Sequence, residues 1–162
     1  MKQAIIISGT PGTGKTTLAK KIAKHLHAEY LDVNTLIQPY HLAQGYDEQL
    51  KTYLINKKRL IKTLNMIINK SKTLLIIDSH LSHYLPKKYV KLCIITKCTM
   101  PILKQRLSKR GYTGRKIQEN LDSERFDVCL VDAAAQHHTI RIIDTSKPIK
   151  TPTLKRLLCT TS

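Results

Sequence analysis

Residues 9–16 read Gly9-Thr10-Pro11-Gly12-Thr13-Gly14-Lys15-Thr16 and match the pattern Gly-x-x-x-x-Gly-Lys-[Ser/Thr]. The apolar, β-branched run at 4–7 that precedes them is typical of a buried parallel strand. Apolar residues at helical spacing between 17 and 26 predict a helix after them. A strand, a glycine-rich turn and a helix in this order form the phosphate-binding P-loop. The sequence therefore predicts a protein that binds a nucleoside triphosphate, ATP.

The residue types of this turn fit the chemistry of phosphate binding. Glycine lets the backbone approach an anion closely, and the N–H groups that open the helix point at phosphate oxygens. We expect Lys15 to contact the β- and γ-phosphates and the Thr16 hydroxyl to ligate Mg²⁺. The predicted nucleotide-binding residues of the turn are Gly12, Thr13, Gly14, Lys15, Thr16 and Thr17.

Length and composition favour one α/β domain that spans residues 1–162. The chain has 162 residues, of which 41% are hydrophobic, which is enough for one core of ordinary size. No apolar run reaches the roughly 18 residues of a membrane span, and the first strand begins at once, which leaves no room for a signal peptide. The four cysteines form no Cys-x-x-Cys pair. We expect a cytoplasmic protein with reduced thiols and no membrane partner.

The net charge of +17 is larger than a nucleotide site requires. Acidic residues are absent from 49–77 and from 79–118, whereas lysines and arginines are frequent there. Such a distribution indicates a polyanionic partner such as RNA. A lysine-rich surface that is merely solvated would produce the same composition, so the charge leaves both interpretations open.

Strands and helices are predicted to alternate along the chain, which indicates a parallel sheet covered on both faces. We expect strands at 4–7, 29–33, 73–78, 91–96 and 139–144, and helices at 17–26, 56–69, 100–109, 114–135 and 151–158. Asn34 or Thr35 is expected to cap a short helix. The polar residues 44–47 predict a turn, in which Asp47 caps the next helical piece.

A second candidate site follows the third strand, at Asp78-Ser79-His80. Ligands of open parallel sheets lie beyond the carboxyl ends of the strands, so Asp78 is placed to hold Mg²⁺ beside the P-loop. His80 can orient a nucleophile or a phosphate, or can simply be a hydrogen-bonded loop residue. A zinc pair formed by His80 and His83 is a weaker interpretation. We expect His137 and His138 to lie at the surface.

Two further basic positions fit a triphosphate site. Arg110, in Lys109-Arg110-Gly111-Tyr112 between two predicted helices, can reach a transferred phosphoryl group from a short lid. Arg106 is a second candidate, and a solvated basic helix end is the alternative for both. Lys147 follows the last strand, where its alkyl chain can lie along a purine base.

These motifs together resemble the adenylate kinase isoenzyme six family over nearly the whole chain. The resemblance rests on the segments 8–17, 45–48, 78–80, 106–112, 119–122 and 126–128. The Asp-x-His box followed by Arg-Gly-Tyr is shared by far fewer protein families than a P-loop alone.

The resemblance implies a P-loop core of five strands in the order 2-3-1-4-5, with an insertion at 34–57 that binds a nucleoside monophosphate and a lid at 109–119. It implies transfer of the ATP γ-phosphate to AMP or a similar monophosphate, and ATPase activity. Lys15, Asp78, His80 and Arg110 would be catalytic, and Arg110 and Lys147 would contact ATP. The family also acts in small ribosomal subunit maturation, with a platform ribosomal protein and pre-rRNA as partners, in the nucleus of eukaryotes.

One departure from the family pattern concerns the acceptor. After the second strand the family commonly has Asn-Val-Gly-Asp-Leu and then a basic residue, whereas this chain has Asp32-Val33-Asn34-Thr35-Leu36-Ile37-Gln38. Arg59 is the only arginine between 34 and 70. Two functions therefore remain open, a nucleoside monophosphate kinase and a ribosome-assembly ATPase with little kinase activity. A small-metabolite kinase of the shikimate kinase type is a third, which the Asp-x-His box disfavours.

Overall fold

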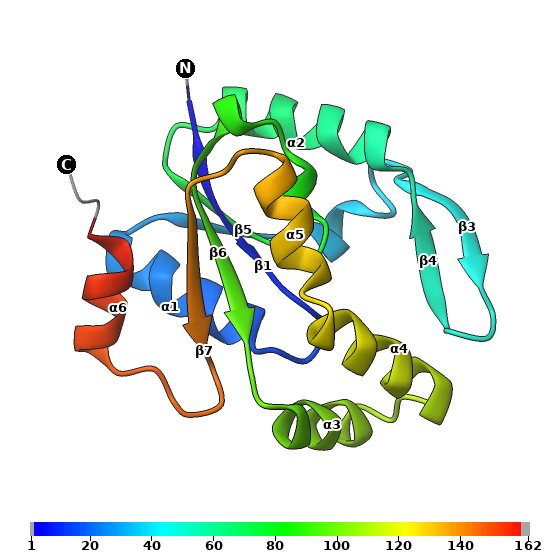
Figure 1. The fold of residues 1–162 in the computed structure, drawn as a ribbon. Helices are drawn as coiled ribbons and strands as arrows, with labels where there is room; N and C mark the ends of the chain where they lie inside the picture. Colours follow the sequence, from blue (N-terminus) through cyan, green and yellow to red (C-terminus); the bar gives the residue numbers. More distant parts are fainter. Residues whose placement is uncertain (1, 160–162) are drawn as a thin grey trace.

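Strand β1 (Ala4–Ser8) lies at the centre of a five-stranded parallel sheet (Figure 1). The computed structural model describes residues 2–159. β1 pairs on one side with β5 (Leu75–Asp78) and on the other with β6 (Val90–Lys97), and β2 (Glu29–Asp32) and β7 (Ile140–Asp144) form the edges. The order β2-β5-β1-β6-β7 is the predicted 2-3-1-4-5 order of the five main strands, which is thereby confirmed. β1 and β5 are buried throughout, as expected for strands covered on both faces.

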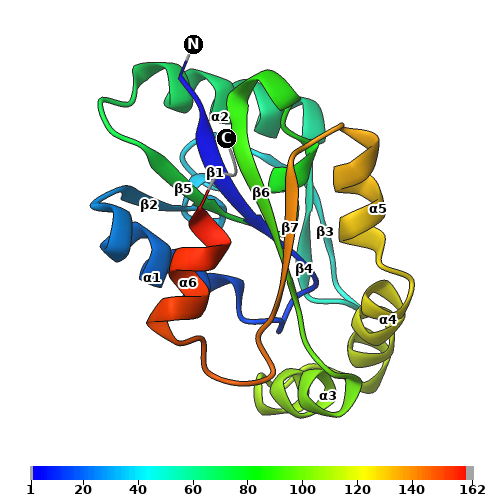
Figure 2. The ribbon, with the colours of Figure 1, turned by 60° about the vertical axis from the view of Figure 1, so that its left-hand side comes forward.

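Helices cover both faces of this sheet (Figure 2). On one face α2 (Lys57–Lys70) and α5 (Val128–Ala135) pack on the side chains of alternate strand residues such as Ile6 and Ile77. On the other face α1 (Lys15–Leu26) and α6 (Thr151–Leu158) pack on the intervening residues such as Ile7 and Ile94. The alternation of side chains along each strand thus divides one apolar sheet between two cores.

A third, smaller core lies beyond the carboxyl end of β6. Helices α3 (Met100–Lys109) and α4 (Gly114–Arg125) form a helical hairpin whose buried residues are Leu103, Leu107 and Leu121, together with Cys98. The connection between them contains Gly111, whose φ of 71° suits a residue without a Cβ. This helical hairpin projects from the same edge of the sheet as the P-loop (Figure 1).

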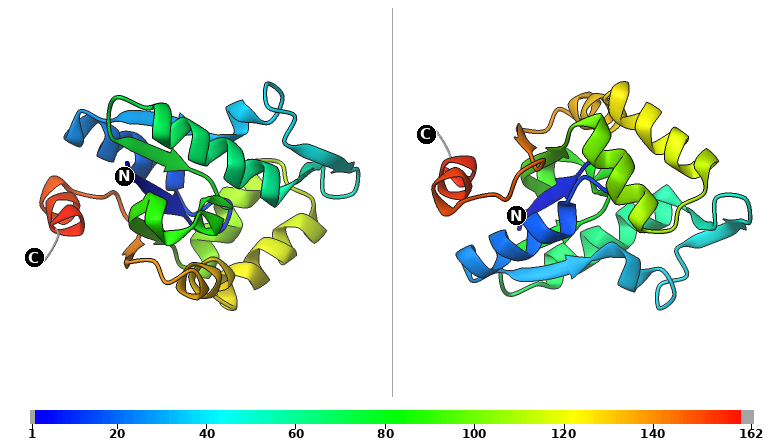
Figure 3. Two further views of the ribbon diagram at one scale, coloured as in Figure 1. Left: turned by 90° about the horizontal axis from the view of Figure 1, so that it is seen from above. Right: turned by 90° about the horizontal axis from the view of Figure 1, so that it is seen from below.

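The predicted turn at 44–47 is wrong, because these residues form a strand. β3 (Ala43–Asp47) and β4 (Thr52–Ile55) make an antiparallel hairpin that projects from the body beside α4 (Figure 3). Tyr46 faces Tyr53 across the strands with ring centroids 5.2 Å apart, and such cross-strand aromatic pairs stabilise a hairpin. Asp47 caps no helix. Its Oδ1 accepts a hydrogen bond of 2.8 Å from the Leu50 N–H within the hairpin turn.

The prediction of one continuous helix at 114–135 is also wrong, because the segment forms two helices. α4 ends at Arg125 and α5 begins at Val128, with Asp127 between them at a left-handed φ of 53°. The Lys97 ammonium binds the Asp127 carboxylate and also donates a hydrogen bond of 3.3 Å to the Glu124 carbonyl. Because asparagine and aspartate tolerate the left-handed region better than most residues, the break falls at Asp127.

The short helix after β2 exists, but its cap differs from the prediction. It is the 3-10 helix η1 (Val33–Leu36), and the side chain of Asp32 caps it by accepting a hydrogen bond of 2.9 Å from the Asn34 N–H. Two more 3-10 helices, η2 (Ser82–Tyr84) and η3 (Lys87–Tyr89), connect β5 to β6. Within residues 2–159, no helix combines the length and the apolar character that crossing a membrane requires.

Candidate active site

The turn between β1 and α1 has the backbone that its glycines predict. Gly9 has a φ of 137°, and a Cβ at this position would lie 2.5 Å from the Thr96 carbonyl oxygen of β6, so only glycine fits. Gly14 precedes α1 with a φ of 83°. Helix α1 therefore opens toward the solvent-accessible side of the turn with its N–H groups free for an anion.

Thr13 differs from its neighbours in this turn. Its side chain is fully buried, and its hydroxyl donates to the Thr10 carbonyl at 2.7 Å and lies 2.7 Å from the Thr96 hydroxyl. The Thr13 N–H donates to the same Thr10 carbonyl at 3.2 Å. Thr13 thus holds the shape of the turn and fastens it to β6, and it lines neither of the two large cavities described below.

Lys15 lies at the start of α1 with its ammonium turned back over the turn. Nζ donates to the carbonyls of Gly9 at 2.8 Å and Thr10 at 3.0 Å. Burial lowers the pKa of Lys15 from 10.5 to about 8, and the nearby Asp78 carboxylate partly opposes this shift. Within residues 2–159 the hydrogen-bond partners of Lys15 Nζ are two neutral carbonyls, and a cation so placed is well suited to an anionic ligand.

Thr16 and Asp78 are brought together as the sequence predicted, although 62 positions separate them. The Thr16 hydroxyl donates to Asp78 Oδ2 at 2.6 Å. Tyr30, which the sequence gave no reason to select, donates its hydroxyl to the same oxygen at 3.0 Å from β2. Burial, and then the Asp78 charge, raise the pKa of the Tyr30 hydroxyl, which keeps it a donor at neutral pH.

This oxygen pair fits Mg²⁺. A hydroxyl and a carboxylate are hard oxygen ligands, and magnesium in nucleotide sites takes only one or two ligands from protein, with phosphate and water completing the octahedron. Residues 2–159 contain no group of three or more His, Cys, Asp or Glu side chains that could hold a metal without such help. Thr16 and Asp78 would thus hold the ion only together with a bound nucleotide.

A first cavity of about 470 Å³, called here the donor cavity, lies on the α6 side of the P-loop. Its lining includes the predicted residues Gly12, Gly14, Thr17, Arg110 and Lys147, together with Arg106, Lys109, Thr145 and Pro148. The volume is within the range of small-molecule sites. Arg106 fastens two walls of this cavity, because its guanidinium donates to the Thr145 carbonyl at 2.7 Å and the Gly12 carbonyl at 3.4 Å.

A second cavity of about 440 Å³, called here the acceptor cavity, lies on the other side of the P-loop. It is lined by the predicted residues Lys15, Thr16, Asp78, His80 and Arg110, and also by Asn34, Leu50, Thr52, Tyr112, Lys116, Glu119 and Asn120. Gly12, Gly14 and Arg110 line both cavities, so the two spaces meet at the P-loop.

The surroundings of His80 favour its neutral form, although part of the residue is exposed to solvent. Desolvation, and then the neighbouring Lys15 charge, lower its pKa to about 4. His83 lies elsewhere, buried with Nδ1 2.8 Å from the Ser8 hydroxyl. The two histidines therefore have different surroundings, and the structure does not support the zinc pair considered from their spacing.

His138 is buried, contrary to the surface position predicted for it. Only 9% of its side chain is exposed, and Nε2 lies 2.9 Å from the His83 carbonyl oxygen. His138 thus connects the residues after α5 to η2, and Tyr84 of η2 donates to Asp132 of α5 at 2.7 Å. Residues 136–139 before β7 are all polar and gave no sign of this burial, which depends on the packing of η2.

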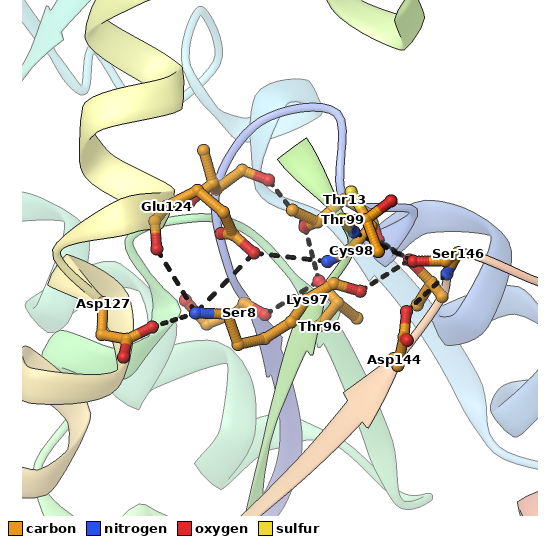
Figure 4. Close-up of polar contacts among 12 residues, drawn as sticks. Ser8, Thr13, Thr96, Lys97, Cys98, Thr99, Glu124, Asp127, Asp144 and Ser146 are labelled. Atoms are coloured by element: carbon orange, nitrogen blue, oxygen red, sulfur yellow. Dashed lines mark hydrogen bonds and ion pairs between the residues drawn. The ribbon is translucent and has the colours of Figure 1, made fainter. Parts of the chain in front are cut away.

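Lys97 is the structural residue of the site that the sequence did not reveal (Figure 4). It ends β6, and its ammonium binds the carboxylate of Asp127 and lies 3.8 Å from that of Glu124. The Lys97 carbonyl accepts a hydrogen bond of 2.8 Å from the Thr145 N–H, at the wall of the donor cavity. Because its partners follow about thirty or more positions later, no local pattern could have identified it.

The comparisons with known proteins agree with this fold. The fold resembles a sugar kinase from a Janibacter species, with a TM-score of 0.63 at 15% identity over 98% of this chain and 91% of that one. A family model described as an AAA domain matches residues 5–127.

Relatives of higher sequence identity identify the family more closely. A protein of Methanocaldococcus jannaschii named putative adenylate kinase is 38% identical over 84% of this chain and 75% of that protein. The adenylate kinase isoenzyme 6 homolog of Schizosaccharomyces pombe is 36% identical over 80% of this chain and 73% of that protein. The chain therefore belongs to the adenylate kinase isoenzyme 6 family, as its motifs predicted.

Proposed function

We propose that the protein transfers the γ-phosphoryl group of ATP to a nucleoside monophosphate, with AMP as the expected acceptor. The observation that carries this proposal is the pair of cavities on either side of the P-loop, which meet at Arg110. One nucleotide in each cavity would bring its phosphates to the same point. Hydrolysis of ATP alone requires no second cavity, and the names of the relatives point to the same reaction.

The donor would lie with its base beside Lys147 and its phosphates in the P-loop. Lys15 would exchange its bonds to the Gly9 and Thr10 carbonyls for oxygens of the β- and γ-phosphates. The acceptor would lie in the other cavity, against an insertion at 34–57 and a lid at 109–119. These boundaries enclose η1 with the β3–β4 hairpin, and the connection between α3 and α4 with the first turns of α4.

The transfer would be an in-line displacement. A phosphate oxygen of the monophosphate attacks the γ-phosphorus of ATP, the bond to the β-γ bridging oxygen breaks, and ADP forms on both sides. The attacking oxygen is already ionised, so no strong base is needed. Arg110 is placed to stabilise charge on the transferred group, and neutral His80 can orient the acceptor by hydrogen bonding.

Magnesium would supply charge neutralisation on the donor phosphates when bound. Thr16 and Asp78 are the residues that would hold it, and their hydrogen bond would give way to shared coordination. Tyr30 would keep its bond to the Asp78 carboxylate and so fix its orientation.

The stoichiometry of ADP formation tests this proposal. With ATP and Mg²⁺, addition of AMP should give two ADP for each ATP consumed, with no release of phosphate, because the γ-phosphoryl group is conserved. Phosphate release that does not depend on AMP, with no additional ADP formed when AMP is present, would contradict a kinase.

A ribosome-assembly ATPase is the second candidate, favoured by the basic surface of the chain. The exposed side of α2 carries Lys57, Lys58, Arg59 and Lys62, in a stretch without acids. Such a surface attracts a polyanion such as rRNA, and the family resemblance adds a small-subunit ribosomal protein. The same assay, repeated with small-subunit rRNA and ribosomal proteins, separates the two functions. Stimulated phosphate release without AMP would identify the ATPase.

A further inference from the structure

The positively charged residues that line the acceptor cavity come from the P-loop and from the segment 109–119, and none comes from the insertion at 34–57. The residues of the insertion that line it are Asn34, Leu50 and Thr52, none of which is charged. Arg59, the single arginine of this region, is not among its lining residues, and its guanidinium donates to the His41 carbonyl at 2.5 Å. A monophosphate dianion in this cavity must therefore be neutralised by residues outside the insertion.

Three cations line the cavity, namely Lys15, Arg110 and Lys116. Lys15 belongs to the P-loop and is needed by the donor phosphates. Arg110 also lines the donor cavity and lies where the two spaces meet. Lys116 lines the acceptor cavity and not the donor cavity, so it is the cation that an acceptor phosphate would not have to share.

Contacts on two sides restrict the side chain of Lys116 before any ligand binds. It lies in the first turn of α4, where its N–H donates to the Thr113 hydroxyl at 3.4 Å. Its ammonium lies 4.2 Å from the centroid of the Tyr112 ring, a cation–π geometry that restricts the side chain. The one hydrogen bond of Nζ among residues 2–159 is long, at 3.4 Å to the Lys51 carbonyl at the hairpin turn. A phosphate oxygen can replace such a carbonyl at little cost.

We infer that Lys116 binds the phosphate of the acceptor nucleoside monophosphate, in the place of the basic residue that the 32–38 segment lacks. This inference rests on the proposed function and assigns its acceptor specificity to α4. The neighbouring Arg115 contacts Gln49, so the first turn of α4 also lies against the turn of the β3–β4 hairpin. Tyr112 supports Lys116 and does not itself carry charge.

The Lys116→Met variant tests the inference. We expect the KM for AMP to rise roughly 10- to 100-fold, the size of a lost charge-assisted hydrogen bond, while the KM for ATP stays within about twofold. Lys116→Arg should recover much of the loss, because the charge returns. Lys104→Met is the matched control, since Lys104 is an exposed lysine of α3 that lines none of the cavities described here. An unchanged KM for AMP, or equal increases for both nucleotides, would overturn the inference.

Direct binding separates this inference from the proposed function. AMP binding to the whole protein is measured by calorimetry in the presence of a non-hydrolysable ATP analogue, and ADP formation is measured in a separate assay with ATP and Mg²⁺, each with the wild type and Lys116→Met. If the wild type binds AMP through Lys116 without forming ADP, the inference holds and the kinase proposal fails. If it forms ADP and the variant binds AMP equally well, the kinase proposal holds and the inference fails. If the wild type does not bind AMP, the inference is wrong.

Discussion

Lys15 is the single residue on which the proposed reaction depends most, because it lies in the P-loop and also lines the acceptor cavity. Its ammonium lies among backbone carbonyls that a triphosphate would replace. We expect Lys15→Ala to reduce the rate of ADP formation by roughly 10²- to 10⁴-fold, because the variant loses a cation that stabilises the transferred charge. The rate is measured at saturating ATP and AMP, with Lys24→Ala, an exposed position of α1, as the control. Retained turnover would contradict the assignment of the site.

The lowered pKa of Lys15 predicts a dependence on pH. Because burial brings the pKa down to about 8, the free enzyme keeps the ammonium below this pH and loses it as the pH rises further. The value of kcat/KM for ATP reports the free enzyme, so it should be level between pH 6.5 and 7.5 and should fall up to tenfold per pH unit above roughly pH 8.

Arginine provides the control for this profile. In Lys15→Arg the guanidinium stays charged, so whatever activity remains should show no such decline between pH 8 and 10. A decline of equal size in both proteins would mean that another group is responsible.

The break between α4 and α5 is the main feature at the scale of elements. Glu124 is 5% exposed, and Lys97 is the cation beside its carboxylate. We expect Lys97→Met to lower the free energy of unfolding by about 2 to 3 kcal/mol, because it leaves a buried carboxylate without its partner. Urea denaturation at pH 7 measures the change. Lys104→Met should stay within about 0.5 kcal/mol of the wild type, and an equal loss in both variants would contradict this role of Lys97.

The elements that the sequence predicted correctly are those specified by local patterns. The P-loop, the parallel strands and the amphipathic helices follow from spacing alone, and so does the meeting of Thr16 with Asp78 at one edge of the sheet. The hairpin was missed because Gly45 and Asp47 are typical turn residues, while the partner of Tyr46 is defined only by pairing with β4. The split helix depends on Lys97, which lies far away in sequence. A local turn signal that misled at Gly45 and Asp47, and long-range contacts that no local pattern shows, account for the two errors.

At the scale of the whole molecule, the two cavities together should bind a ligand that spans them. Two adenosines joined by five phosphates would place one base in each cavity and the phosphates along the P-loop. We expect such a compound to bind roughly 100-fold more tightly than ATP, because the second nucleoside binds at a high effective concentration. Calorimetry measures both affinities, and a rise in Tm should accompany the tighter binding.

A compound with one adenosine and four phosphates is the control for this experiment. It carries comparable charge but reaches only one cavity. If both compounds bind alike, the second cavity contributes nothing to nucleotide binding and the proposed reaction loses its main support.

The ion pairs of Lys97 hold only one end of α4. They bind Glu124, in the last turn of this helix, and Asp127, which follows it, against the end of β6 (Figure 4). Lys116 lies eight positions before Glu124, which is about 12 Å along a helix. A rotation of about 10° around the held end therefore swings Lys116 through roughly 2 Å, enough to make or break a hydrogen bond. Of the residues of α4 that line the acceptor cavity, Lys116 is the one farthest from the end held by the ion pairs, so any tilt of the helix would change its distance to a bound phosphate most.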